Sequence, residues 1–393
     1  SPPAVPLAEL LDALDRTTAQ PVRERIITRH PLQPFDVKNV TPDALVPDVP
    51  FTFDPTALAA AQAAAGTRSE PVEFCSAPLP ALPPADINLA DLLDFFSDPV
   101  KGFFRALNYT LPWDIDGIDD AIPVTIDALD VWQVGERTLH DIMRGMQSEV
   151  AKEAEWRRGT LPPLKLGWRQ AETIATMAAG LADAAVKHQH GDARARDVDI
   201  ELGNGRRITG TVNRVFDNRI VVVTYSKLPP KYRLSAWISL IALAADSPGR
   251  EWSAYCIGRN DNGDEVDVCC LAAPPDPLAV LHDLVLIFDA GRREPLPLPL
   301  KTSHVWSQKR GQGRRDPGKY ATNTWSSKDK KGNDIGDNTL HSHVRVWGRG
   351  SPFEVLVRDA PRPGEEMPGE DSRFGALAAR LWAPLLRAEG RLR

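Results

Sequence analysis

Alternating apolar and polar positions are clearest in the middle of the chain. Strict alternation over residues 197–202 predicts a strand with one face in the core and the other in solvent. The turn 203–205 leads into a second predicted strand, 206–215, and the dipeptide Asp217-Asn218 separates that strand from a third, 220–227. The pattern therefore predicts a β-hairpin that is preceded by one further strand.

Apolar residues at intervals of three and four predict helices on both sides of these strands. The stripe that begins at Trp168 predicts a helix over 168–187, and a Pro-Pro break precedes an apolar helix over 234–245. Asp276 before Pro277 is typical of a helix start, here of a helix over 278–290. Further helices are predicted over 7–15, 55–65, 89–96, from Pro99, from Thr138 towards Arg157 and over 374–386, and extended segments over 123–130, 252–258 and 264–271.

Three to five short strands with helices before and after them predict an α/β fold, a small mixed β-sheet flanked by helices. Residues 1–87 are rich in Pro and Ala and allow only short helices, because proline removes a helical hydrogen bond. This part is expected to be a linker together with the end of a preceding domain. A compact domain is expected over residues 88–393. The chain opens on Ser1 and is expected to be part of a longer polypeptide.

The predicted hairpin has the shape of a nuclease active site. In metal-dependent nucleases of the PD-(D/E)xK type, the first strand carries an Asp, and the second carries an acid and a Lys two residues apart, hence on one face. Here Asn213 takes the first position, and Thr224 and Ser226 take the pair. A shift by one residue gives Tyr225 and Lys227, which recovers the Lys but no acid. We therefore expect a nuclease-like fold with a degenerate active site and no catalytic residue.

Two other groups of side chains offer alternatives. Asp199, Glu201 and Asp217 are acids near the hairpin and would supply a migrated metal site in an active nuclease. Alternation also fits a solvated strand face for Asp197, Asp199 and Glu201, and Asp217 is a common turn residue. The pairs His188/His190 and His341/His343, the latter on a predicted strand, are spaced to share a cation or simply to lie in solvent. No metal and no cofactor is expected.

Cysteine spacing and hydropathy bear on metal sites and on membrane spans. The four cysteines (Cys75, Cys256, Cys269 and Cys270) show no zinc spacing and no iron–sulfur cluster motif, and they are expected to be reduced core thiols of a cytoplasmic protein. No apolar run reaches the length of a membrane span.

Charge is distributed unevenly along the chain. Residues 301–331 hold nine Lys or Arg and two Asp, a local balance of +7 within a net charge of −6. We call residues 306–331 the basic segment; its glycines predict a flexible loop. Binding to DNA, pairing with an acidic partner surface and a solvated excursion without a role all remain open. The candidate DNA-binding residues are Lys309, Arg310, Arg314, Arg315, Lys319, Tyr320, Trp325, Lys328, Lys330 and Lys331.

Several short motifs, taken in order, resemble the RecC family, the gamma subunits of exodeoxyribonuclease V. The segment 29–35 is similar to the end of that family's helicase-like part, and 95–104 to the opening of its C-terminal domain. The resemblance covers about residues 25–390. It continues through Leu111-Pro112-Trp113, residues 126–130, Gly159-Thr160-Leu161-Pro162-Pro163, the hairpin with the apolar helix after it, and Leu296-Pro297-Leu298-Pro299.

The resemblance implies a non-catalytic, PD-(D/E)xK-like C-terminal domain in a RecBCD-type complex. Its partners would be RecB-type and RecD-type subunits, which carry the motors and the nuclease activity. The RecC-type subunit would hold them together, part the strands of duplex DNA ends and guide single-stranded DNA during recombinational repair of double-strand breaks. Residues 1–87 would then end the helicase-like region. An active nuclease and an interaction module without DNA contact remain the alternatives.

Overall fold

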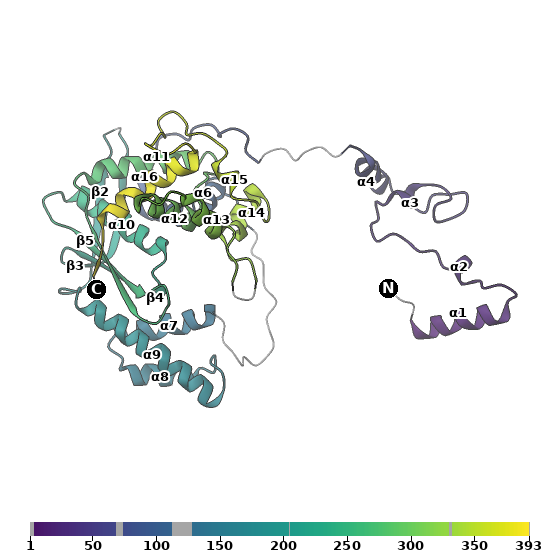
Figure 1. Ribbon diagram of the computed structural model, residues 1–393, viewed down its shortest axis with the longest axis horizontal. Helices are drawn as coiled ribbons and strands as arrows, with labels where there is room; N and C mark the ends of the chain where they lie inside the picture. The colour runs from purple at the N-terminus through teal and green to yellow at the C-terminus, as the bar shows by residue number, and fades with distance from the viewer. Residues whose placement is uncertain (1–3, 68–73, 112–127, 204, 330–331, 393) are drawn as a thin grey trace. The chain divides into compact units, whose positions relative to one another are not determined.

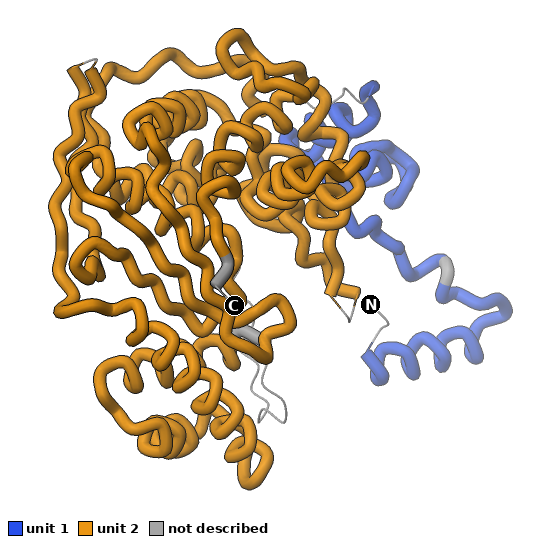
Figure 2. Tube along the Cα trace, turned by 60° about the vertical axis from the view of Figure 1, so that its left-hand side comes forward, with its two compact units in different colours: residues 1–73 blue, residues 74–393 orange. Residues whose placement is uncertain are grey.

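The computed structural model describes residues 4–67, 74–111, 128–203, 205–329 and 332–392. The chain divides into two compact units, residues 1–73 and 74–393, coloured separately in Figure 2. Several residues used in the predictions lie outside the described ranges. They are Pro112, Trp113, residues 123–127, Asn204, Lys330 and Lys331.

The first unit consists of short helices: α1 (Val5–Thr17), α2 (Arg23–Ile26), α3 (Val37–Val40) and α4 (Pro55–Ala65). The helices predicted over 7–15 and 55–65 are confirmed. Asp54 caps α4, because its carboxylate accepts a hydrogen bond from the Thr56 N–H. Little apolar surface is covered in this unit, and Leu32 and Phe53 are 94% and 79% exposed.

One mixed sheet organises the second unit. Within the described residues it has seven strands in the order β1-β3-β4-β5-β6-β7, and β2 also pairs with β3. Neighbours are antiparallel except for the parallel pairs β1/β3 and β4/β5. The strands are β1 (Ile87–Asn88), β2 (Arg194–Glu201), β3 (Arg207–Phe216), β4 (Arg219–Lys227), β5 (Ser253–Arg259), β6 (Val266–Ala272) and β7 (Glu389–Leu392).

Helices cover both faces of the sheet (Figure 1). On one face α5 (Leu89–Ser97), α10 (Pro230–Asp246), α11 (Pro277–Gly291) and α16 (Arg373–Ala388) form the larger core with residues such as Trp237. On the other face α7 (Ala128–Met143) and α9 (Leu164–Val186), with α8 (Ser148–Arg157) packed on them, cover a smaller core. Alternate residues of β4 face the two cores, which explains its nearly continuous apolar run.

A further group of helices lies beside α16: α6 (Pro99–Ala106), α12 (Leu300–Gly311), α13 (Pro317–Trp325), η1 (Asp337–Thr339), α14 (His341–Trp347) and α15 (Glu354–Val357). Their small core contains Trp325, Phe353 and Phe374. The indole N–H of the fully buried Trp325 donates a 2.7 Å hydrogen bond to the Ser351 carbonyl. This bond satisfies the polar atom of an otherwise apolar side chain.

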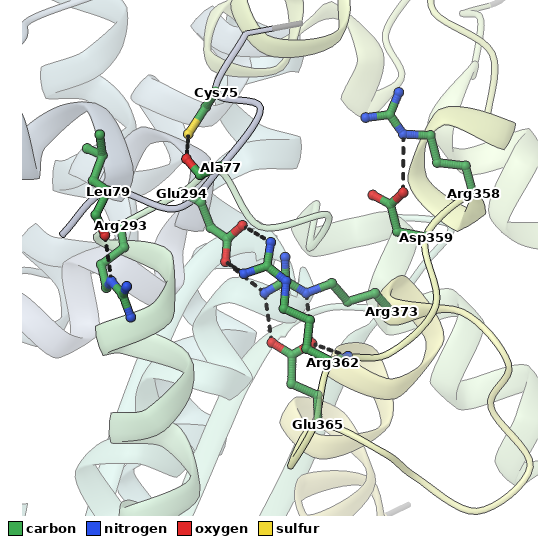
Figure 3. Close-up of polar contacts among 10 residues, drawn as sticks. All are labelled: Cys75, Ala77, Leu79, Arg293, Glu294, Arg358, Asp359, Arg362, Glu365 and Arg373. Carbon is green, nitrogen blue, oxygen red and sulfur yellow. Dashed lines mark hydrogen bonds and ion pairs between the residues drawn. The ribbon is translucent and has the colours of Figure 1, made fainter. Parts of the chain in front are cut away.

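A buried ion cluster fixes the segment before α16 to the end of α11 (Figure 3). Arg373 donates to Glu365 at 2.7 Å and to Glu294 at 3.0 Å, and Arg362 donates to the same Glu294 at 2.5 Å. Arg373 is only 5% exposed. Two cations and two carboxylates therefore neutralise each other where water has little access.

The sheet and the long helices follow the predicted pattern, with the predicted helix at 278–290 capped by the Asp276 carboxylate as expected. Three predictions were wrong. The helix expected from Thr138 to Arg157 is two helices, because the chain turns at Gly145, whose φ is +94°. Residues 128–130 begin α7 and are not extended, and His341 and His343 lie on a helix and not on a strand.

The sheet is wider than the three to five strands expected. Its additional strands are β1, with two residues, and β7, with four. Segments this short carry no readable alternation, and both are placed by neighbours distant in sequence: β1 by β3, and β7 by β6.

Candidate nucleic-acid interface

The strands of the hairpin separate soon after their turn. β3 and β4 pair only at Val215↔Ile220 and Phe216↔Arg219. One edge of β3 is paired with β2 along most of its length. The opposite edge is shared: β4 pairs with its last residues, and β1 pairs with Ile208 and Thr209 near its start. The hairpin and its turn are thus confirmed, but Asn213 has no ladder partner on β4.

The three positions compared with a nuclease site have different surroundings. Asn213 is exposed, Ser226 is half-buried and Thr224 is buried. The Thr224 hydroxyl donates to Glu136 Oε2 at 3.2 Å, and the Tyr225 N–H donates to the same oxygen at 2.8 Å. Sequence reasoning missed Glu136, which comes from α7, 88 residues before Thr224 in the chain. Its carboxylate stabilises the end of β4.

Of the three acids of the alternative nuclease site, Asp199 and Glu201 share the exposed face of β2, whereas Asp217 lies apart from them. Asp199 forms a 2.6 Å ion pair with Arg207, and Asp217 pairs with Arg250. Asp199 is opposite Thr209, and Asp217 lies in the turn after β3, eight residues beyond Thr209 and about 25 Å away at the usual rise of a strand. In the described part of the chain, no three His, Cys, Asp or Glu side chains are grouped to hold a metal ion.

The histidine pairs also find separate surroundings. His188 stacks on Tyr255 with ring centroids 4.1 Å apart, and burial together with nearby Arg219 lowers its pKa. His190 Nε2 lies 3.0 Å from the Arg219 guanidinium. His343 is buried between Trp325 and Trp347, and two residues along a helix His341 faces another direction.

The prediction of a flexible loop for the basic segment was wrong. The segment consists largely of two helices, α12 and α13, joined by a short turn. Proline at the start of α13 and the Asp316 cap, which accepts from the Lys319 N–H, make this helix possible. Its aromatic candidates differ, because Tyr320 is exposed whereas Trp325 is buried. Trp325 therefore packs in the core and does not offer a stacking surface.

The cations of this segment also differ. Arg310 is paired with Glu370 at 3.0 Å, and Lys328 lies 3.4 Å from Asp334. Lys309 lies over the Tyr320 ring, with its nitrogen 5.1 Å from the centroid. Arg314, Arg315 and Lys319 are exposed, and their side chains contact no acid of the described residues. These three are the cations most available to an external anion.

Comparison with known proteins gives consistent matches. The model of the RecC C-terminal domain family matches residues 84–311. RecBCD enzyme subunit RecC of Mycobacterium tuberculosis strain H37Rv is 60% identical over 389 residues, which are 99% of this chain and 35% of that protein. The subunit of the same name from Mycolicibacterium smegmatis is 54% identical over 388 residues, again 99% and 35%.

The chain thus spans 35% of the length of these relatives. Across the described ranges, no helix is both long enough and apolar enough to cross a membrane.

Proposed function

The chain belongs to the RecC C-terminal domain family, and we propose that it is a non-catalytic part of a RecBCD-type complex that binds and guides DNA ends. Its partners in this proposal are RecB-type and RecD-type subunits, and its setting is the repair of double-strand breaks. Motor and nuclease activities are assigned to those partners. The proposal places the complex in the cytoplasm.

The observation that carries the proposal is that the β3–β4 hairpin lacks the acids and the lysine of a nuclease site. The hairpin and α10 after it have the order expected of a PD-(D/E)xK-type nuclease. Asn213, Thr224 and Ser226 stand where the acids and the lysine are needed. Thr224 is buried and bonded to Glu136, so the position now has a structural role. This supports a nuclease-like fold that has lost its metal site.

Residues 1–87 are proposed to end a helicase-like region and to link it to the domain 88–393. The first unit exposes many large apolar side chains for its size, Leu32 and Phe53 among them, and an extensive apolar surface of this kind is typical of a contact with further protein. The units divide between Glu73 and Phe74, and the family match begins at residue 84. Both positions support a boundary in this part of the chain.

DNA contact is proposed for the exposed side of the α12–α13 hairpin, with Arg314, Arg315 and Lys319 as its main cations. Lys309, Arg310, Tyr320 and Lys328 lie on the same two helices or just beyond them. Such a surface binds phosphates without sequence preference, and each phosphate contact adds about 0.9 to the slope of log affinity against log salt.

The test replaces Arg314, Arg315 and Lys319 by Glu in the full-length chain, assembled with its partners. Affinity for a labelled duplex end should fall, and the salt slope should decrease by about 2.7. A matched control replaces Lys165, Arg169 and Lys187 by Glu. These cations are exposed on α9 or directly after it, away from the α12–α13 hairpin. Equal affinity and slope in the two triple variants would contradict DNA contact here.

A further inference from the structure

A second cationic surface lies on the opposite side of the sheet from α10. It is an open cleft of about 780 Å³ between α7 and the β3–β4 hairpin, which we call the arginine cleft. This volume is in the range of sites for small ligands and is far too small for a duplex. The lining residues used below are Trp132, Glu136, Arg137, Asp141, Arg144, Arg158 and Arg214.

A β-bulge directs Arg214 into this cleft. Arg194 and Arg196 of β2 are two residues apart but pair with Val215 and Val212, which are three apart. Val212 and Val215 both face the larger core, so β3 has an extra residue between them. Arg214 adopts a φ of +57°, which is uncommon for a residue with a Cβ. Bulges often serve to redirect a side chain.

The charges of the cleft are only partly neutralised. Arg137 donates to the buried Glu155 at 2.8 Å, and Arg158 lies 3.2 Å from the same carboxylate. One acid is thus shared by two guanidinium groups, and hydrogen bonding to it raises the pKa of Arg137. Glu136 and Asp141 also line the cleft, and Glu136 accepts hydrogen bonds from the Thr224 hydroxyl and the Tyr225 N–H. With Glu155, these acids are three against four arginines, which leaves one positive charge in excess.

Arg144, just after α7, and Arg214 are both exposed, and neither contacts an acid of the described residues. Trp132, near the start of α7, adds a half-buried indole to the same cleft. Guanidinium groups bind phosphate oxygens with two parallel hydrogen bonds, and indole rings stack on unpaired bases. The combination fits a short stretch of single-stranded nucleic acid.

From this arrangement we propose that the arginine cleft binds one strand of DNA after the duplex has been opened. Arg144 and Arg214 contact successive parts of the phosphate backbone, and Trp132 stacks on a base. The inference rests on the proposed function, because an opened strand must be delivered to the cleft. It adds a single-strand site separate from the α12–α13 hairpin.

The test needs a signal specific to this cleft, because partner subunits bind DNA as well. The photoreactive residue p-benzoylphenylalanine replaces Trp132 in the full-length chain of the assembled complex. Irradiation with a labelled duplex bearing a single-stranded tail should join the chain to the tail. Trp156 of α8, also half-exposed but outside the cleft, carries the same group in the control and should give only background.

Arg144→Gln and Arg214→Gln are then combined with the photoreactive group at position 132. Crosslinking should fall about tenfold, because hydrogen bonds to charged groups are lost at two phosphates. Its salt slope should fall by about 1.4, since each single-strand contact contributes about 0.7. Arg196→Gln, an exposed arginine of β2 that does not line the cleft, should leave both values unchanged.

The outcomes separate this inference from the proposed function. Background crosslinking at position 132, or a signal that the double Gln variant leaves intact, would overturn the strand site. If the Arg314, Arg315 and Lys319 variant still loses end binding, the proposed function stands without the cleft. Strong crosslinking at position 132 together with unchanged end binding by that variant supports the cleft and contradicts DNA contact at the α12–α13 hairpin.

Discussion

At the residue scale, three side chains of the β3–β4 hairpin determine whether it could bind a catalytic metal ion. Sequence alone showed that no carboxylate stands at positions 213, 224 or 226. It could not show that Glu136 bonds to Thr224, because a contact between a helix and a strand 88 residues apart leaves no local pattern. Trp325 was expected to be accessible to DNA, but it is buried in a core with Phe353 and Phe374. Both phenylalanines are distant in sequence, so this contact also leaves no local pattern.

Arg373 should be among the most sensitive residues. Replacing it with Met leaves Glu365 and Glu294 without their buried partner and should lower the free energy of unfolding by about 3–5 kcal/mol. Arg157→Met removes an exposed pair with Glu153 and should cost less than about 1 kcal/mol. Urea unfolding measures both; equal losses would contradict the importance of the buried cluster.

The same cluster predicts how stability depends on acid. Burial raises the pKa of Glu365, but the hydrogen bond and charge of Arg373 outweigh it and leave this pKa below its usual value. The resulting stability is complete above the unfolded carboxyl pKa of about 4.3 and is lost as pH falls through the lower folded value. Glu365→Gln should therefore flatten the fall in stability below about pH 4.3, measured by unfolding at several pH values; an unchanged fall would exclude this origin.

The cysteine thiols offer a simple check of burial. Burial raises the pKa of Cys256 to about 12, and burial, aided by Glu389, also raises that of Cys269. Since the thiolate is the reactive form, neither should react with a thiol reagent at about pH 8 in the folded chain. Both should react once the chain is unfolded. Rapid labelling of Cys256 in the folded protein, located by mass spectrometry, would contradict this burial.

At the level of elements, long patterned segments were predictable and their interruptions were not. The strands β2 to β6 and the helices α9, α10, α11 and α16 all follow their apolar spacing. The break between α7 and α8 is local, at Gly145 with its positive φ, whereas the pairing of β1 depends on a strand distant in sequence. Glycines favoured a loop at the basic segment, although Asp316 and Pro317 are typical signals for a helix start.

The contact between α7 and β4 should tolerate no added side chain at Gly135. A Cβ there would overlap the buried Tyr225 ring. Gly135→Ala should therefore lower the free energy of unfolding by about 1–3 kcal/mol. Gly180→Ala on α9 meets only ordinary contact with Val266 and should be neutral or stabilising by up to about 1 kcal/mol. Thermal unfolding compares the two, and equal stability would contradict this close packing.

At the scale of the whole molecule, the resemblance seen in short motifs agrees with the family match over residues 84–311. The sheet flanked by helices was predictable in kind, because helices precede and follow its strands in the chain. The structure has two cationic surfaces, the α12–α13 hairpin and the arginine cleft, which belong to different helices. Counting charges along the sequence pointed only to the first, because the arginines of the cleft are distant from one another in the chain. In the proposed function, the first surface contacts a duplex end and the second contacts one opened strand.

The central claim is that this domain binds DNA ends and does not cut them. The direct measurement follows a labelled duplex end with the purified full-length chain, free of its partners, in Mg²⁺ and in Mn²⁺, recording binding and cleavage in the same samples. We predict salt-sensitive binding without cleavage in either metal. Metal-dependent cleavage that copurifies with the chain and is lost in Asp199→Asn, Glu201→Gln or Asp217→Asn would contradict the account and identify an active nuclease.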